Sequence, residues 1–196
     1  MFLYCRSLTT APVLQATTLA SYCYDSMFQG CTSLTTAPSI LPATTLANSC
    51  YASMFKNCTS LTTAPDLPAT TLASSCYDSM FARCTSLTAA PALPGTTLAN
   101  YCYRFMFEGC SSLTTAPTLP ATTLANNCYD GMFGTCSNLN TIKLSYTGNF
   151  ADAPSNAFNN WVSGVSSSGT FYYNGSDTTT GESAIPEGWT VTPFTS

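Results

Sequence analysis

The chain contains no histidine and very few charged side chains. Of its 196 residues, five are Lys or Arg and nine are Asp or Glu, so 7% are charged, against roughly 25% in an average globular protein. Without histidine, the chain lacks the commonest general base and metal ligand. A net charge of −4 and the lack of a basic cluster leave no positive surface for a nucleic acid. We therefore expect no metal, no cofactor and no nucleic-acid partner.

Long apolar runs are also missing. No stretch approaches the roughly 18 consecutive apolar residues that indicate a membrane helix, so we expect no membrane span. The beginning, MFLYCRSLTT, has no charged leader followed by an apolar segment and a cleavage site, so we expect no signal peptide. Because Met1 and Phe2 fall inside a repeat, we expect the chain to be a fragment of a longer protein.

The chain does contain an internal repeat, and 45% of its residues are apolar, which is enough to build a core. The dipeptide Met-Phe recurs at Met1, Met27, Met54, Met80, Met106 and Met132. The spacing is 26 residues, except for one spacing of 27 that we assign to a loop insertion in residues 39–42. A period of this length is typical of a solenoid, in which each unit buries its apolar face against its neighbours.

Each unit divides into an expected strand and an expected helix. Between Leu72 and Cys84, the apolar residues fall on one half of a helical wheel and most polar residues on the other. This pattern predicts a helix of about 11 to 13 residues, with Gly30, Asn57 and Gly109 at the C-terminal capping point of three copies. Residues 60–64, which precede Pro65, contain β-branched threonines and predict a short strand.

The sequence therefore predicts an α/β solenoid over residues 1–144, with about six 26-residue strand–helix repeats and a parallel sheet on one face. The predicted core consists of Leu34, Leu61, Leu87, Leu113, Cys58, Cys84, Cys110, Met80 and Phe81. Residues 145–196 no longer follow the period. There, Phe158, Trp161 and Val162 recur at helical spacing, and 169–173 reads as a strand. We expect a small α+β cap that packs on the last repeat.

The last copy, Cys136-Ser-Asn-Leu139-Asn-Thr-Ile142-Lys-Leu144, resembles the core of leucine-rich repeats. Cys-x-x-Leu, a proline-ended loop, a helix and a Phe three residues before the next Cys together resemble the BspA-like leucine-rich repeat surface proteins of Bacteroidetes. The Met-Phe-x-x-Cys-x-x-Leu stretch is also similar to Met-Phe repeats of mycoplasma-type surface lipoproteins. The resemblance implies a leucine-rich-repeat solenoid at an extracellular or cell-surface location. The tail phrases Trp-x-x-Gly-Val and Ile-Pro-x-Gly-Trp-Thr-Val resemble modules of gut Bacteroidales and phage surface proteins.

The eleven cysteines form one column before the strands and a second on the expected helices. Both columns fall on the buried side, which favours their role as small buried hydrophobes. Disulfides between stacked neighbours in the first column remain an alternative, because strand spacing brings such residues close. A metal or redox role is a further alternative, although the chain has neither a CxxC motif nor histidine.

Threonine pairs and tyrosines supply the candidate binding surface. It consists of Thr35, Thr36, Thr62, Thr63, Thr114, Thr115, Tyr77 and Tyr103. The threonines would form hydroxyl rows along the sheet, either as a structural ladder or as a flat face for a glycan or for ice. The tyrosines are expected either to bury their rings and keep wet hydroxyls or to form a carbohydrate-stacking stripe. Charges that vary between copies, as at Asp78 and Arg104, leave partner recognition on the helix face open.

These features favour a binding module over an enzyme. No histidine can activate a serine, and the carboxylates of Asp66, Asp152, Glu182 and Glu187 are scattered along the sequence, so we expect no catalysis. We expect an extracellular or surface adhesion module that recognises a glycan or a host or partner protein through the repeat surface. The alternative is a purely structural segment of a surface appendage or phage fibre. An open first repeat, with Met1, Phe2 and Leu8 exposed, also predicts self-association.

Overall fold

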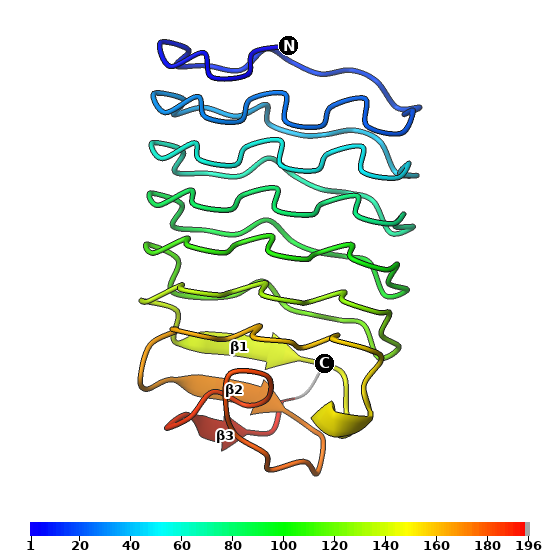
Figure 1. Ribbon diagram of the computed structural model, residues 1–196, viewed down its shortest axis with the longest axis vertical. Helices are drawn as coiled ribbons and strands as arrows, with labels where there is room; N and C mark the ends of the chain where they lie inside the picture. The colour runs from blue at the N-terminus through cyan, green and yellow to red at the C-terminus, as the bar shows by residue number, and fades with distance from the viewer. Residues whose placement is uncertain (195–196) are drawn as a thin grey trace.

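The computed structural model describes residues 1–194, which wind into coils stacked along the long axis (Figure 1). The N-terminal coil lies at one end of the stack and three short parallel strands lie at the other. Each coil has two long sides. One side carries the threonine pairs and the other carries the Cys-Tyr and Met-Phe residues.

The second side is not helical. Residues 1–194 contain no α-helix, and their single helical element is the 3-10 helix Phe150–Asp152. The prediction of a helix in each repeat is therefore wrong. Each stretch instead forms a row of consecutive turns, here called a turn row; the rows cover residues 20–31, 47–58, 73–84, 99–110, 125–136 and 154–164.

A positive φ at every fourth residue converts the expected helix into a turn row. In the third row the φ angles are 54° at Ser75, 55° at Ser79 and 61° at Arg83. The same positions hold Ser, Asn or Gly in most other rows, which are residues that tolerate this conformation in turns. A right-handed helix cannot contain such residues, because its hydrogen bonds require negative φ throughout.

Backbone hydrogen bonds in a turn row alternate between two kinds. The N–H of Asp78 donates within the row to the carbonyl of Ser75, at 3.2 Å. The N–H of the preceding residue, Tyr77, donates to the carbonyl of Cys102 in the next coil, at 3.1 Å. Because every other amide bonds to the next coil, neighbouring turn rows lie as close as parallel strands rather than as packed helices.

The threonine side pairs between coils through isolated parallel bridges. One series includes Thr10–Thr36, Thr63–Ala89 and Thr115–Thr141, and a second joins Thr45, Thr71, Thr97 and Thr123 in a row. At the C-terminal end the pairing lengthens into strands β1 (Thr141–Leu144), β2 (Thr170–Tyr173) and β3 (Thr190–Thr192). These form one parallel sheet in the order β1-β2-β3, so the parallel sheet is present.

The tail continues the stacking of the coils, where we expected a small α+β cap packed on the last repeat. The amides of Asn127, Tyr129 and Phe133 donate to carbonyls in the 154–164 turn row, just as earlier rows bond to their successors. Strand β1 pairs with β2 at a shift of 29 residues, as in Thr141 with Thr170. The expected strand at 169–173 is β2, but the expected helix around Trp161 is a further turn row.

The core lies between the two sides of every coil and is built from identical residues stacked on one another. Neighbouring phenylalanine rings from Phe2 to Phe133 are 5.5–5.8 Å apart, with interplanar angles of at most 13°. All nine predicted core residues are fully buried: Leu34, Leu61, Leu87, Leu113, Cys58, Cys84, Cys110, Met80 and Phe81. Trp161 packs against Phe133, the last ring of this phenylalanine column, with the ring centroids 6.2 Å apart.

Candidate functional site

The predicted threonine surface is exposed. The six predicted threonines, Thr35, Thr36, Thr62, Thr63, Thr114 and Thr115, all face solvent. The hydroxyl of Thr35 donates to the carbonyl of Thr9 at 3.1 Å, and that of Thr88 donates to Thr62 at 3.4 Å. These hydroxyl protons therefore tie neighbouring coils together, while the hydroxyl oxygens remain available as acceptors.

A second row of threonines also forms an exposed surface, which we did not predict. Thr45, Thr71, Thr97 and Thr123 are all exposed and bridge one another, and so face solvent in one continuous row. Thr70 and Thr71 stand directly before the expected helix, where threonine would favour a helix cap, but no helix follows them in the structure. The available signal was the recurrence of a second Thr-Thr pair in successive copies. The six predicted threonines and these four are together called the threonine face.

The tyrosines do not belong to this surface. Tyr77 and Tyr103 are only 2% and 1% exposed, so their placement in the candidate binding surface is wrong. Their rings stack on each other at 5.9 Å with an interplanar angle of 0°, inside a column that runs from Tyr24 to Tyr129. Burial raises the pKa of the Tyr77 and Tyr103 phenols. A carbohydrate-stacking stripe is therefore excluded at these positions, because a sugar cannot reach the ring faces.

Nine of the eleven cysteines are buried, all eleven are free, and only Cys5 and Cys23 are exposed. In the column before the threonine side, each buried thiol donates to a phenylalanine carbonyl of the preceding coil, as Cys58 does to Phe28 at 3.1 Å. Burial raises the pKa of the Cys58 thiol to about 12. Such thiols are poor nucleophiles and metal ligands, because both roles require the thiolate. Within residues 1–194, no group of three His, Cys, Asp or Glu side chains is arranged to hold a metal ion.

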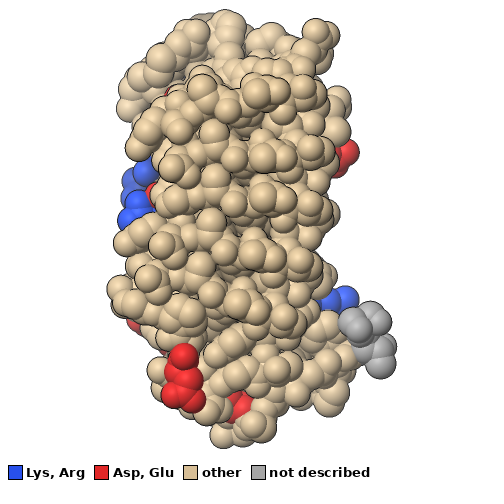
Figure 2. All heavy atoms as spheres, turned by 90° about the vertical axis from the view of Figure 1, so that its right-hand side faces the viewer, with Lys and Arg blue, Asp and Glu red and all other residues tan. Residues whose placement is uncertain are grey.

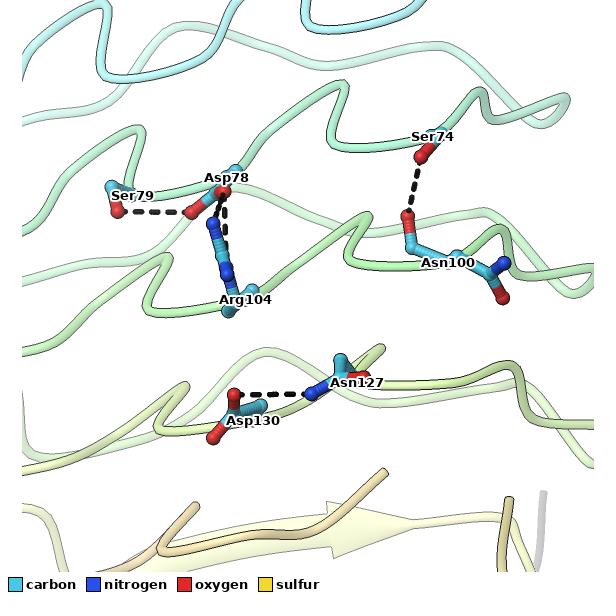
Figure 3. Close-up of polar contacts among 7 residues, drawn as sticks. All are labelled: Ser74, Asp78, Ser79, Asn100, Arg104, Asn127 and Asp130. Atoms are coloured by element: carbon cyan, nitrogen blue, oxygen red, sulfur yellow. Dashed lines mark hydrogen bonds and ion pairs between the residues drawn. The ribbon is translucent and has the colours of Figure 1, made fainter. Parts of the chain in front are cut away.

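One ion pair crosses the turn rows, as Figure 3 shows. Two nitrogens of the Arg104 guanidinium donate to one carboxylate oxygen of Asp78, at 2.6 and 3.1 Å. Ser79 donates to the other oxygen of Asp78 at 3.0 Å. In the next coil, Asp130 accepts hydrogen bonds from Asn127 and Asn159. These hydrogen bonds join neighbouring coils, with Asp78 paired to a cation and Asp130 held by two neutral amides.

Two tail carboxylates line a common surface pocket. Glu182 and Glu187 lie with Val162, Gly188 and their neighbours around a hollow of about 370 Å³, which Asp66 and Asp152 do not line. Both glutamates are exposed, and nothing in the described hydrogen bonds joins them into an acid–base pair. Much of the remaining surface is uncharged, as the face in Figure 2 shows. No helix in residues 1–194 is long and apolar enough to cross a membrane.

Comparison with known families accounts for the stacked coils. The sequence model of the BspA-type leucine-rich repeat region matches residues 1–129 and 51–168, with six copies of the repeat. No curated protein and no solved structure matches the chain. Repeat regions of this non-enzymatic type suggest a protein-binding or structural module. Since the matched residues cover most of the chain and coincide with its stacked coils, the chain belongs to the BspA-type leucine-rich repeat family.

Proposed function

We propose that this protein is an extracellular or cell-surface binding module that recognises a glycan or a partner protein through its threonine face. The observation that carries the proposal is the exposure of threonine side chains in rows that repeat from coil to coil. Parallel pairing spaces such rows at roughly 4.8 Å. A face of this regularity suits a ligand that is itself repetitive or extended.

The chemistry of the face favours many weak polar contacts. Threonine hydroxyl oxygens accept hydrogen bonds from sugar hydroxyls or from protein amides, and each such contact contributes only about 1 kcal/mol. Tyr77 and Tyr103 are buried and add no aromatic contacts. Affinity would therefore come from several rows engaged together, and it would depend little on salt because the face carries few charges.

The test is a binding screen against a glycan array and immobilised surface proteins, using the intact chain and two triple variants. In the first variant, Thr36→Lys, Thr62→Lys and Thr115→Lys place three charges on the threonine face. In the matched control, Ser21→Lys, Asn48→Lys and Asn126→Lys place the same charges at exposed turn-row positions. Binding by the intact chain and the control, lost in the first variant with an unchanged melting temperature, supports the proposal. Equal binding by both variants contradicts it.

The alternative is a purely structural segment with no ligand site. Its support is the uniformity of the coils that carry the Met-Phe repeat, because the same residue types occupy their buried columns and only Ala89 interrupts its threonine row. A segment of this kind acts as a spacer whose stiffness comes from the continuous bridges and stacked rings. It predicts no saturable binding to any array component, whichever triple variant is used.

A further inference from the structure

The middle of the threonine face holds side chains that differ from coil to coil. Between the two threonine rows, each coil turns one residue outward at the same place. Asp66 is exposed there, whereas its neighbours Pro65 and Leu67 are buried. The series, here called the central column, is Ile40, Asp66, Ala92, Thr118, Lys143 and Tyr172. Since the flanking threonine rows are nearly uniform, these six positions give the face its individual pattern.

Pairing between coils holds the central column in register. Ile40 bridges Asp66, and Lys143 in β1 pairs with Tyr172 in β2. The amide of Leu119 donates to the carbonyl of Lys143 at 2.9 Å, which carries the register from the regular coils into the sheet. At ~4.8 Å per coil, Asp66 and Lys143 are three coils and therefore roughly 14 Å apart.

Two opposite charges stand in the central column. Asp66 and Lys143 are both exposed, and within residues 1–194 neither forms an ion pair. The Lys143 ammonium lies 5.3 Å from the centre of the Tyr172 ring, which keeps it on the column. On the turn rows, by contrast, Arg104 is paired with Asp78. The threonine face therefore presents one negative and one positive charge, neither of them neutralised by a described side chain.

The order of the central column makes it complementary to itself. Read from either end, it runs from an apolar side chain through a charge to a small residue in the middle. Ile40, which is 40% exposed, is one coil beyond Asp66, and the aromatic Tyr172 is one coil beyond Lys143. A second column laid over the first in reverse order pairs Ile40 with Tyr172 and Asp66 with Lys143. This reciprocity is what an interface with two-fold symmetry requires.

We propose that the partner recognised by the threonine face is a second copy of this chain, which lies face to face with the first and with its stack reversed. The inference rests on the proposed function and names its partner. The two-fold axis runs parallel to the paired strands and passes between Ala92 and Thr118. Asp66 of each copy then meets Lys143 of the other copy, and Ile40 of each meets Tyr172 of the other.

The charges select this arrangement over the other symmetric one. A two-fold axis along the stack would place Asp66 on Asp66 and Lys143 on Lys143, and like charges in contact repel. A neutral glycan offers no charge to either residue, and an acidic glycan repels Asp66. Any other partner must present a cation and an anion roughly 14 Å apart, a pattern that the second copy already carries.

The threonine rows provide the rest of the contact. At ~4.8 Å per coil and ~3.4 Å per residue, the face over six coils covers roughly 800 Å², about what each partner of a standard-size interface buries. The reversed arrangement lays each threonine row on the same row of the other copy. Unlike Thr35, whose hydroxyl donates to a carbonyl of its own chain, Thr36 and Thr63 make no described side-chain hydrogen bond. Their hydroxyls can therefore donate across the interface.

The test exchanges the two charges and measures self-association of the full chain by sedimentation equilibrium. Asp66→Lys leaves two lysines in the column and Lys143→Asp leaves two aspartates, so each single variant opposes like charges at both contacts. The double variant restores opposite charges, and so does an equal mixture of the two single variants. As a control, Lys56→Asp makes the same change of charge on a turn row. All four variants should keep the melting temperature of the parent chain.

We expect the parent chain and the control to form dimers, and each single variant to dimerise at least about tenfold more weakly, because two attractions become two repulsions. The double variant and the mixture should return to within about threefold of the parent. Carbodiimide should also join Asp66 of one copy to Lys143 of the other, as mixed isotope-labelled and unlabelled chains would reveal by mass. Within one chain the two groups are too far apart to be joined directly.

A parent chain that stays monomeric at millimolar concentration overturns the inference. If that monomer still binds an array component through its threonines, the proposed function stands and only the choice of partner fails. Self-association that is equally strong in the single variants also overturns the inference. The contact would then lie elsewhere, as at the open first repeat, through which the sequence predicts self-association.

Discussion

At the scale of single residues, the ion pair between Asp78 and Arg104 is the feature that most depends on one side chain. Asp78 is 9% exposed, and it relies on Arg104 and Ser79 for its hydrogen bonds. Removal of the cation should destabilise the folded protein, because the cost of taking the Asp78 carboxylate out of water is then no longer offset by an opposite charge. The second pair, between Arg83 and Glu108, is longer at 3.5 Å and the Arg83 side chain is 62% exposed.

We therefore expect Arg104→Ala to lower the free energy of unfolding by about 1 kcal/mol, at the upper end for partly exposed pairs. The matched variant Arg83→Ala should change it by less than about 0.5 kcal/mol, because solvent screens the exposed pair. Urea titration of both variants beside the parent chain measures the two values. Equal losses would show that burial of Asp78 has no role.

The buried thiols predict a loss of stability at alkaline pH. Burial raises the pKa of Cys76 and of Cys136 to about 12, above the value of about 8.5 for a thiol in an unfolded chain. Between these values the folded chain binds more protons than the unfolded chain, so stability is complete below the lower pKa and falls as pH rises.

Each such thiol contributes up to about 1.4 kcal/mol per pH unit in that window. Denaturant unfolding at a series of pH values should show a constant stability near neutrality and a decline from about pH 8.5. The variant Cys76→Ala should decline less steeply, because one proton fewer is linked to unfolding. A flat profile through this range would mean that the thiols are not buried as described.

At the scale of elements, the turn row shows what the sequence pattern can and cannot determine. Cys76, Met80 and Cys84 recur at a strict spacing of four, and both a helix and a turn row place such residues on one face. The buried columns were therefore predictable, but the backbone was not. The distinguishing signal is a polar residue at every fourth position of the turn row, as at Ser75 and Ser79, which adopt positive φ.

Substitutions at Ser53 distinguish a turn row from an α-helix, because its φ is 52°. No described residue bonds to the Ser53 hydroxyl, so its replacement removes no side-chain hydrogen bond. We expect Ser53→Gly to be more stable than Ser53→Ala by about 1 kcal/mol, since glycine adopts positive φ without steric cost. An α-helix would give the reverse order by a similar amount. At the neighbouring position, where φ is not positive, Ala52→Gly should destabilise. Thermal unfolding of the three variants measures the order.

At the scale of the whole molecule, the sequence predicts the number and stacking of regular repeats but not their extension into the tail. Ala157, Phe158, Trp161, Val162 and Val165 stand 29 residues after Cys128, Tyr129, Met132, Phe133 and Cys136, and so continue the same columns. Every one of these substitutions changes the residue type, which hides the repeat from a search for Met-Phe. Apolar character is retained at these positions, but side-chain size is not, since Trp161 is larger than Met132 and Val162 is smaller than Phe133.

The threonine face was predictable in part for the same reason. Exposure of Thr36 and Thr62 follows from their place between buried Leu and Pro positions. Burial of Tyr77 does not follow, because on a helix it would lie at the edge of the apolar arc, whereas the close spacing of turn rows covers both ring faces. The error in the site therefore derives from the error in the backbone.

The coils stack without helices, and far-UV circular dichroism of the intact chain tests this most directly. A strand–helix solenoid would place about 11 to 13 residues of every repeat in a helix and give the paired helical minima at high intensity. The structure predicts a weak spectrum without those minima, because residues 1–194 contain no α-helix. Strong helical minima in the folded chain, lost cooperatively on heating, would contradict the turn rows and everything derived from their hydrogen bonds.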